Sequence, residues 1–236
     1  MENNHKYASR EYWDERFTEE GSFEWLVEFD AFKHLVLPKL KWSSRILHVG
    51  CGTSQMSMQL YRMGYKNITN VDFSKVVVDN GRTLHPEMKW ICEDIRSLAS
   101  IPSDAFDVVL EKATIESMLV GEKSAWNPSD NALRIVDDVL KSVARVLTSD
   151  GMNCCNSDEG NVVEKDFAGI FVSVSFTQPH FRVPAFLRFP GWSISVNKIG
   201  EFFHYFVYIM QCGRETSQDV RKRFANIAPD WCRVLR

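Results

Sequence analysis

Short apolar runs alternate with amphipathic stretches from Arg45 onward, which is the pattern of repeated strand and helix units. Apolar runs of strand length predict strands at 45–49, 67–71, 88–92, 106–110, 171–177, 192–196 and 202–211. Apolar residues in helical register predict helices at 54–63, 74–84 and 131–147. The last two strands are separated by a predicted turn at 198–201. The pattern therefore predicts an α/β fold with a mostly parallel seven-stranded sheet, a C-terminal antiparallel hairpin and helices on both faces.

The segment before this pattern is predicted to be helical. Ser9 is placed to cap a short helix that carries Trp13 and Phe17 on one face. A second amphipathic stretch, with apolar residues in helical register, runs over 29–40. Because an apolar helix face needs another element to cover it, we interpret this segment as an extension or lid on the main domain.

The regular pattern weakens after the predicted helix at 131–147. A polar stretch follows this helix, and the tail of the chain has only weak helical periodicity and a short basic run typical of a solvated surface. We divide the chain into an N-terminal helical extension or lid at 1–43, the main α/β domain at 44–213, which holds a predicted insertion at 153–170, and a C-terminal tail at 214–236.

Composition restricts the classes of protein that fit this pattern. The 236 residues are 44% hydrophobic, which suffices for one α/β domain with its own core. The 28 Lys and Arg residues against 31 Asp and Glu residues give a formal charge of −3, so the bulk charge does not favour a nucleic-acid partner. No stretch approaches the roughly 20 apolar residues that cross a bilayer, so we expect no membrane partner.

Cysteine usage and the N-terminal residues indicate a compartment. The six cysteines contain no C-x-x-C pair, which argues against a zinc site and against a secreted disulfide framework. The first residues lack an apolar signal segment and include Glu2 and Glu11, whereas transit peptides avoid acidic residues. We therefore expect a cytoplasmic protein that holds no metal ion. We also expect a monomer.

A glycine-rich turn supplies the first candidate for chemistry. Gly50, Cys51 and Gly52 follow the first predicted strand and precede a helix, so the backbone can approach a ligand closely there. Asp72 stands 20 residues beyond Gly52, at the end of the second strand, where a carboxylate can accept both hydroxyls of a ribose. A dinucleotide-binding fold uses the same combination of a glycine turn and an acid. Taken alone, the two glycines would also fit an ordinary turn, and Asp72 would also fit a helix cap ahead of Ser74.

Three details favour S-adenosylmethionine over a dinucleotide. Gln55 stands where a dinucleotide fingerprint has its third glycine. Asp94 follows the third strand, where its carboxylate can bind the exocyclic amine of adenine while Ile95 packs against the ring. The closing antiparallel hairpin is not needed by a nicotinamide-binding domain. Ligands of open α/β sheets bind at the carboxyl ends of strands, so these groups are expected to meet at one site.

The fourth strand ends in Glu111 and Lys112. Lys112 is placed either to bind the methionyl carboxylate or to pair with Glu116 four residues later. Trp13, Phe17 and Trp25 are aromatic enough to cover a cofactor, although composition alone favours core packing for such residues.

A resemblance covers most of the chain, from about Tyr7 to Gly213. It rests on the segments Glu11-Tyr12-Trp13-Asp14-Glu15-Arg16-Phe17, Arg45-Ile46-Leu47-His48-Val49-Gly50-Cys51-Gly52, Val71-Asp72-Phe73-Ser74 and Val108-Val109-Leu110-Glu111-Lys112. In these the chain resembles the methyltransferase-like family of protein lysine methyltransferases, which have a Rossmann-like seven-stranded fold. The resemblance implies S-adenosyl-L-methionine as cofactor, S-adenosyl-L-homocysteine as product and translation elongation factor 1-alpha as protein substrate.

The resemblance extends the set of candidate cofactor-binding residues. It implies that the N-terminal aromatic residues enclose the cofactor, against the preference from composition. Together with the glycine turn, the set is Trp13, Phe17, Trp25, Gly50, Cys51, Gly52, Asp72, Phe73, Asp94, Ile95 and Lys112.

Two features depart from the family pattern. Most class I methyltransferases have an acid at the position of His48, where it orders the glycine loop or binds the methionyl amine. The segment 153–170 has no counterpart in relatives, and a disturbance of the following strand would change substrate docking rather than cofactor binding.

Methyl transfer to a lysine amine is an in-line displacement, so positioning and desolvation are the main demands on the enzyme. Glu111 is a candidate for a group that assists proton loss, and 178–182 is expected near the acceptor channel. The alternatives are another protein acceptor such as citrate synthase, for which a transit peptide would be expected, a small-molecule acceptor, or a non-catalytic scaffold that keeps the cofactor site.

Overall fold

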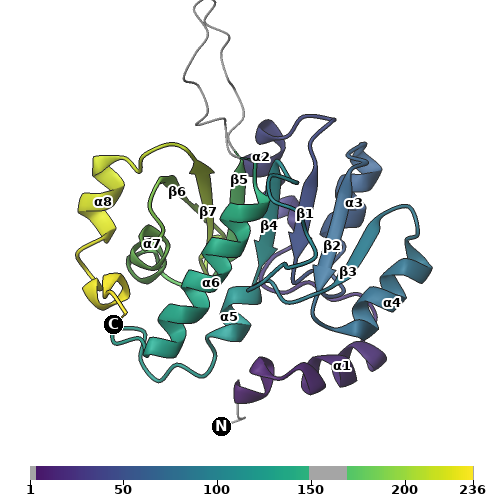
Figure 1. The fold of residues 1–236 in the computed structure, drawn as a ribbon, viewed down its shortest axis with the longest axis horizontal. Coiled ribbons are helices and arrows are strands. Elements are labelled where there is room, and N and C mark those ends of the chain that lie inside the picture. Colours follow the sequence, from purple (N-terminus) through teal and green to yellow (C-terminus); the bar gives the residue numbers. More distant parts are fainter. Residues whose placement is uncertain (1–3, 149–168, 236) are drawn as a thin grey trace, which may run out of the picture.

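The computed structural model describes residues 4–148 and 169–235, and seven strands in these ranges form one mixed sheet (Figure 1). The strands are β1 (Ile46–Val49), β2 (Ile68–Asp72), β3 (Lys89–Cys92), β4 (Val108–Lys112), β5 (Ile170–Ser175), β6 (Trp192–Ile199) and β7 (Tyr205–Cys212). Their order is β3-β2-β1-β4-β5-β7-β6, with β7 antiparallel to both of its neighbours and all other pairs parallel. This confirms the predicted fold class.

The α-helices of the described residues are α1 (Arg10–Glu19), α2 (Lys33–Val36), α3 (Met56–Met63), α4 (Lys75–Leu84), α5 (Thr114–Met118), α6 (Asp130–Val146), α7 (Pro179–Leu187) and α8 (Gln218–Phe224). Helices α3, α4 and α6 lie where the sequence pattern predicts them, whereas α5, α7 and α8 were not predicted. Four short 3₁₀ helices complete the described elements, at η1 (Asn4–Ala8), η2 (Phe29–Ala31), η3 (Leu37–Lys39) and η4 (Pro229–Cys232).

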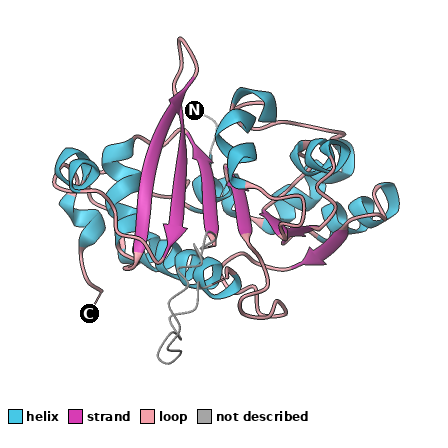
Figure 2. Ribbon diagram, turned by 90° about the horizontal axis from the view of Figure 1, so that it is seen from above, coloured by secondary structure: helices cyan, strands magenta, loops and turns pink. Residues whose placement is uncertain are grey.

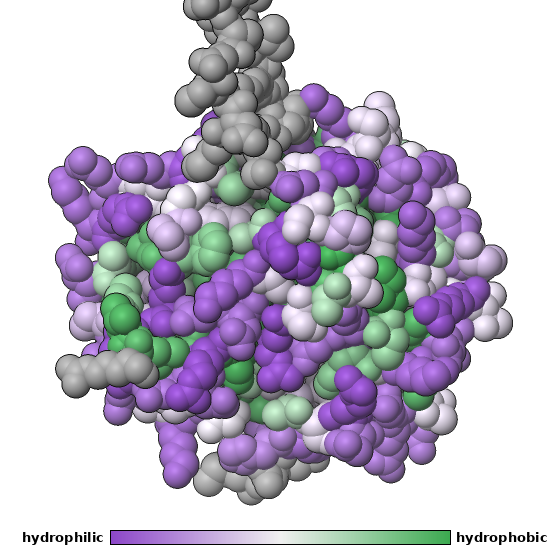
Figure 3. Space-filling view, viewed as in Figure 1, coloured by the Kyte–Doolittle hydropathy of each residue, from purple (hydrophilic) through white to green (hydrophobic). Residues whose placement is uncertain are grey.

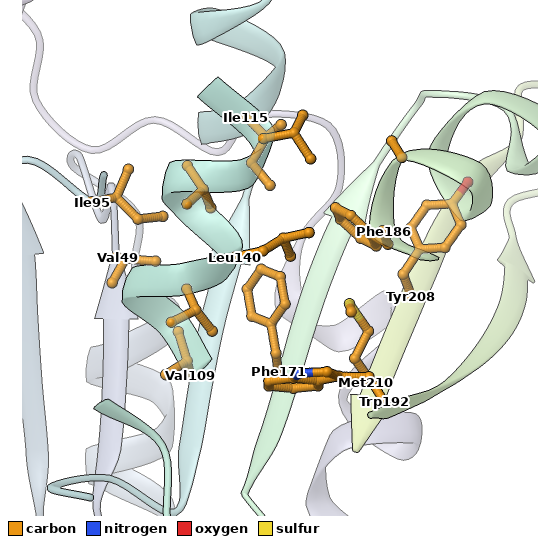
Figure 4. Close-up of a cluster of buried hydrophobic side chains, with 14 of the residues drawn as sticks. Val49, Ile95, Val109, Ile115, Leu140, Phe171, Phe186, Trp192, Tyr208 and Met210 are labelled. Carbon is orange, nitrogen blue, oxygen red and sulfur yellow. The ribbon is translucent and has the colours of Figure 1, made fainter. Parts of the chain in front are cut away.

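The core lies in two layers, one on each face of the sheet. Alternate strand residues point to opposite faces, so Leu47 packs with α6 and α7 while Ile46 packs with α3 and the segment before β1. Figure 4 shows the first layer, in which Leu140 of α6 lies between Val49 of β1 and Phe186 of α7. The sheet is thus buried on both faces at its centre, as a parallel sheet requires.

Helix α6 shows why the pattern predicts this layer well. Ser129 caps the helix by accepting a hydrogen bond from the N–H of Ala132 at 3.1 Å. Its buried residues recur at helical spacing, with Val136, Val139 and Val143 on the face toward the sheet.

The N-terminal segment agrees with the prediction in part. Ser9 caps α1 as expected, with its hydroxyl accepting from the N–H of Tyr12. The predicted helix over 29–40 is wrong as one element, because the structure has the short pieces η2, α2 and η3 there. Phe32 leaves helical geometry at φ −131°, and Pro38 removes a backbone donor, so one continuous helix cannot form.

The C-terminal half corrects two boundaries. The predicted turn at 198–201 is wrong, since Lys198 still pairs with Phe206 and the turn occupies 200–204. Gly200 has φ +90°, and a Cβ there would overlap the carbonyl oxygen of Phe203, so the turn requires glycine. Helix α7 was not predicted, because Pro179 and Pro184 disfavour helix in sequence, although Pro179 fits the first turn, where no N–H is needed.

The predicted insertion mostly lies outside the described residues. Within its range, Ile170 belongs to β5, which pairs with β4 on one side and β7 on the other. Strand five is therefore fully built into the sheet. The tail beyond 213 packs on the same core through Trp231, whose indole N–H donates to the carbonyl of Ala125 at 2.7 Å.

The surface in Figure 3 is mostly hydrophilic, with apolar side chains in separate patches. Within the described ranges, helices are either too short or too polar to cross a membrane.

Candidate active site

A cavity of about 310 Å³ lies between the carboxyl ends of the first four strands and the N-terminal segment. Figure 1 shows α1 at the end of the sheet toward which β2 points. The structure brings all the candidate cofactor-binding residues together on this cavity: Trp13, Phe17, Trp25, Gly50, Cys51, Gly52, Asp72, Phe73, Asp94, Ile95 and Lys112.

The glycine loop after β1 has a backbone that only glycine adopts easily. Gly50 and Gly52 have φ angles of +58° and +49°. A Cβ on Gly50 would overlap the side chain of Thr114, and a Cβ on Gly52 would lie 3.4 Å from Phe17. Between them, the N–H of Cys51 donates to the carbonyl of Val71 and holds the loop against β2. The loop therefore brings bare backbone to the cavity wall.

Asp72 is fixed at the end of β2 by two backbone donors. Its carboxylate accepts from the N–H of Gly52 and from the N–H of Ser74, both at 2.9 Å. The side chain is 4% exposed, and burial raises its pKa to about 6 against the opposing effect of these hydrogen bonds. The cap of α4 is Ser74, so Asp72 is not explained as a helix cap. Each carboxylate oxygen keeps a lone pair for a ligand hydroxyl.

Asp94 stands at the next strand end, beyond β3. Arg96 binds both of its carboxylate oxygens, with the shortest N–O distance at 2.6 Å. Partial burial alone would raise the pKa of Asp94, but the hydrogen bonds from Arg96 outweigh burial and hold the pKa below its usual value. Ile95 is buried beside it and forms part of the cavity wall.

Lys112 at the end of β4 pairs with a residue that the sequence did not indicate. Its ammonium forms an ion pair with Glu24 and donates to the carbonyl of Val27 at 3.0 Å. The alternative pairing with Glu116 is wrong, because Glu116 is bound to Arg182. One N–H of Lys112 remains for the cavity.

Glu24 connects the N-terminal segment to the glycine loop. Besides Lys112, its carboxylate accepts from the N–H of Gln55 and from the hydroxyl of Ser54. Glu24 and Lys112 are 88 positions apart, so no local spacing in the sequence could have identified the pair.

His48 presents an acceptor to the cavity. Its Nδ1 lies 2.8 Å from the hydroxyl of Ser57, which donates in turn to the side-chain carbonyl of Asn70. Ser57 therefore accepts from the Nδ1–H of His48. Burial, with a smaller effect of Lys112, lowers the pKa of His48 to about 3, so the ring is neutral. Its Nε2 has no protein hydrogen-bond partner among the described residues, and the residue lines the cavity.

The aromatic residues of the N-terminal segment form a wall of the cavity and also pack on one another. Trp13 and Phe17 are buried and stacked, with ring centroids 5.3 Å apart. The indole N–H of Trp13 donates to the carbonyl of Tyr7 at 2.8 Å, and Trp25 contacts Trp13 edge to face. These residues thus pack as a cluster and also line the cavity, while their contact with a cofactor stays a prediction.

Glu111 is not among the residues that line the cavity, which corrects the expectation that it assists proton loss. Its carboxylate accepts from the N–H groups of Thr114 and Ile115 and from the hydroxyl of Ser173. Burial, reinforced by the nearby Glu116, raises its pKa to about 7. Glu111 therefore holds the start of α5 in place behind the cavity wall.

The other end of the cavity is lined by residues that the sequence did not indicate as site residues. They come from α5 and from the residue after β5, and include Thr114, Glu116, Ser117 and Phe176. Glu116 binds Arg182, Ser175 and Thr177, so this end is built by contacts between α5, β5 and α7. No group of three His, Cys, Asp or Glu residues in the described ranges is arranged to hold a metal ion.

Comparison with known proteins agrees with this geometry. A methyltransferase domain family matches residues 47–155. The EEF1A lysine methyltransferase 4 of Mus musculus is 36% identical to this chain over 92% of the chain and 80% of the relative, and that of Bos taurus is 35% identical over the same shares.

A solved structure gives the same fold at low identity. The N-methyltransferase NodS from Bradyrhizobium japonicum, in complex with S-adenosyl-L-homocysteine, is 10% identical and covers 90% of this chain and all of its own at a TM-score of 0.56. The fold, the site at the strand ends and the sequence identity of 35–36% to these relatives over 92% of the chain show its family. This chain belongs to the methyltransferase family that includes the EEF1A lysine methyltransferases.

Proposed function

We propose that this chain is an S-adenosyl-L-methionine-dependent protein-lysine N-methyltransferase that acts on translation elongation factor 1-alpha. The observation that carries the cofactor assignment is one cavity in which a glycine loop and acids from two successive strand ends face an aromatic wall. The acceptor assignment rests on the names of relatives that match nearly the whole chain.

The nucleoside half of the cofactor fits the β2 and β3 side of the cavity. Asp72 would accept from the two ribose hydroxyls, and Asp94 would accept from the exocyclic amine of adenine. Phe73 and Ile95 supply apolar surface for the ring.

The methionyl half fits the polar groups beside the glycine loop. Lys112 offers an N–H to the α-carboxylate, and the Nε2 of the neutral His48 offers a lone pair to the α-ammonium. A donor and an acceptor on the same side of the cavity match the opposite polarity of these two ligand groups.

The chemistry that the cofactor supplies when bound is a methyl group on a positively charged sulfur. The protein has to hold the acceptor amine in line and remove its water. Met118, Val120 and Phe176 line the cavity with apolar surface, and a desolvated amine loses its proton more easily than one in water. No side chain is required as a dedicated base.

The test is incubation of the purified protein with tritiated S-adenosyl-L-methionine and either purified elongation factor 1-alpha or a cell lysate. The expected result is label on the elongation factor, absent with Asp72→Ala. Label on a different protein, such as citrate synthase, or on a small molecule would reject the acceptor. No labelled product from a protein that binds S-adenosyl-L-homocysteine would indicate a non-catalytic scaffold.

A further inference from the structure

The turn between β6 and β7 carries two adjacent aromatic side chains that are mostly in solvent. Phe202 is 98% exposed and Phe203 is 62% exposed. Figure 2 shows this hairpin extending beyond the neighbouring strands. Burying such side chains under a partner is favourable, and adjacent exposed aromatic residues at a protruding tip are typical of a protein interaction site.

The register of the sheet places this tip on the same side as the cavity. Ser175, the last residue of β5, pairs with Phe206 of β7, which pairs with Lys198 of β6, so the turn at 200–204 extends past the carboxyl end of β5. The next residue after β5 is Phe176, which lines the acceptor end of the cavity. The hydroxyl of Tyr208 donates to the carbonyl of Thr177 at 2.6 Å and ties this segment to the hairpin.

A groove of about 420 Å³ lies beside the hairpin, between β6, β7, α7 and α8. Its lining begins at Gln178, two residues after Phe176, so one short segment connects the cavity to the groove. Lys198 and Arg223 are exposed on it and form no ion pair with another described residue. Asp219 is the acidic residue of the lining, which also includes His180 and His204. The lining of the groove thus carries two basic side chains against one acidic side chain, on a chain whose formal charge is −3.

We propose that the hairpin tip and this groove form a docking surface for the protein substrate, with Phe202 and Phe203 in apolar contact and the groove holding an acidic segment of the substrate. The proposal rests on the proposed function, because it requires a protein acceptor. A docked acidic segment is attracted by Lys198 and Arg223, and the tip and groove together direct the acceptor lysine toward Phe176.

The test compares two double variants with matched controls. The variants are Phe202→Ser with Phe203→Ser, and Lys198→Glu with Arg223→Glu. Leu84→Ser removes an exposed apolar side chain from α4, and Arg134→Glu with Lys141→Glu reverses exposed charges on α6, so these serve as controls. Affinity for S-adenosyl-L-homocysteine and the melting temperature are measured for every variant to exclude loss of the fold or of the cofactor site.

The expected result is that the KM for elongation factor 1-alpha rises about tenfold or more in both docking variants, while the controls and all cofactor affinities stay at the wild-type value. An unchanged KM would overturn the docking surface and leave the proposed function intact. Binding of the elongation factor is also measured without methyl transfer. Loss of that binding in the variants supports the docking surface even if the wild type transfers no methyl group, whereas a wild type that does not bind the elongation factor overturns it.

Discussion

The two ends of the cavity are built in different ways. The nucleoside end, at β2 and β3, is made of motifs at strand ends, in which the N–H groups of Gly52 and Ser74 fix Asp72 and the neighbouring Arg96 fixes Asp94. The acceptor end, at α5, β5 and the hairpin, is held by side-chain pairs between distant segments, such as Glu116 with Arg182. The first can be found from spacing along the chain, and the second only from the topology of the sheet.

Two buried carboxylates make the comparison concrete. Asp72 is the last residue of β2 and Glu111 the last but one of β4, and both are at most 4% exposed with a pKa raised by burial. Asp72 lines the cavity, whereas Glu111 uses its oxygens on the N–H groups of α5 and on Ser173. Burial and a raised pKa alone therefore do not identify the functional acid.

The largest expected effect distinguishes these two acids. Asp72→Ala removes two charge-assisted acceptor positions for the ribose and leaves the N–H of Gly52 without its partner. We expect affinity for S-adenosyl-L-homocysteine to fall at least about 100-fold in a calorimetric titration. Glu111→Gln changes the buried acid that does not line the cavity, so it should leave the affinity for S-adenosyl-L-homocysteine unchanged. Equal losses of affinity in both variants would contradict the assignment of Asp72, and not Glu111, to the cofactor site.

A second prediction concerns the acceptor end. Arg182→Met leaves Glu116 buried without its ion-pair partner, which should lower the free energy of unfolding by about 3–5 kcal/mol in a urea titration. Affinity for S-adenosyl-L-homocysteine should stay within about threefold, because Arg182 does not line the cavity. Adding Glu116→Gln to this variant should restore part of the stability. A cofactor affinity that falls with Arg182→Met would show that the two ends are not separate.

A third prediction uses glycines with similar backbones. Gly50 and Gly191 both have positive φ, but only at Gly50 would a Cβ meet other atoms, those of Thr114. Gly50→Ala should cost about 1 kcal/mol of backbone strain and a further 1–3 kcal/mol of overpacking, while Gly191→Ala should cost only the strain. Thermal melting measures the difference. Equal shifts in melting temperature would reject the close approach of the glycine loop to α5.

The smallest expected effect is a pH dependence from Asp72. Its pKa is about 6, and the ionised form is the acceptor of the ribose hydroxyls, so cofactor affinity should be full above pH 7 and fall as the pH drops through 6. At pH 5 roughly a tenth is ionised, giving a loss of about tenfold. Asp72→Asn should flatten this profile, and Glu111→Gln should not. A wild-type profile that stays flat to pH 5 would contradict the assignment.

The stability arising from Asp72 should change in the opposite direction. A carboxyl whose pKa is raised from 3.8 to about 6 holds its proton more tightly when folded than when unfolded. Its contribution to the free energy of unfolding therefore decreases as the pH rises from about 4 to 6. Measuring affinity and stability on the same samples separates ligand binding from a general effect of acid on the fold.

The sequence predicted the sheet, and that Gly50, Asp72 and Asp94 meet at one cavity, for a physical reason. Strands such as β1 are short apolar runs, and Gly50, Asp72 and Asp94 follow strand ends at fixed places, so local spacing carries the information. The sequence pattern failed at 29–40, where apolar spacing suggested one helix that Pro38 prevents. It also misplaced the turn between β6 and β7.

The remaining site residues depend on contacts that spacing does not encode. Glu24 meets Lys112 across 88 positions, and Glu116 meets Arg182 across 66. Arg182 lies on α7, whose two prolines conceal the helix in sequence. His48 was recognised as a departure from the family pattern, but its neutral state depends on burial and on Ser57, which only the fold reveals.

The central claim is that this cavity serves methyl transfer to a lysine of elongation factor 1-alpha. Its most direct test is tandem mass spectrometry of the purified elongation factor after incubation with the wild-type protein and S-adenosyl-L-methionine. The account predicts a lysine that gains one to three methyl groups with the wild type and none with Asp72→Ala. An elongation factor that remains unmodified, under conditions in which the wild type binds the cofactor, would contradict it.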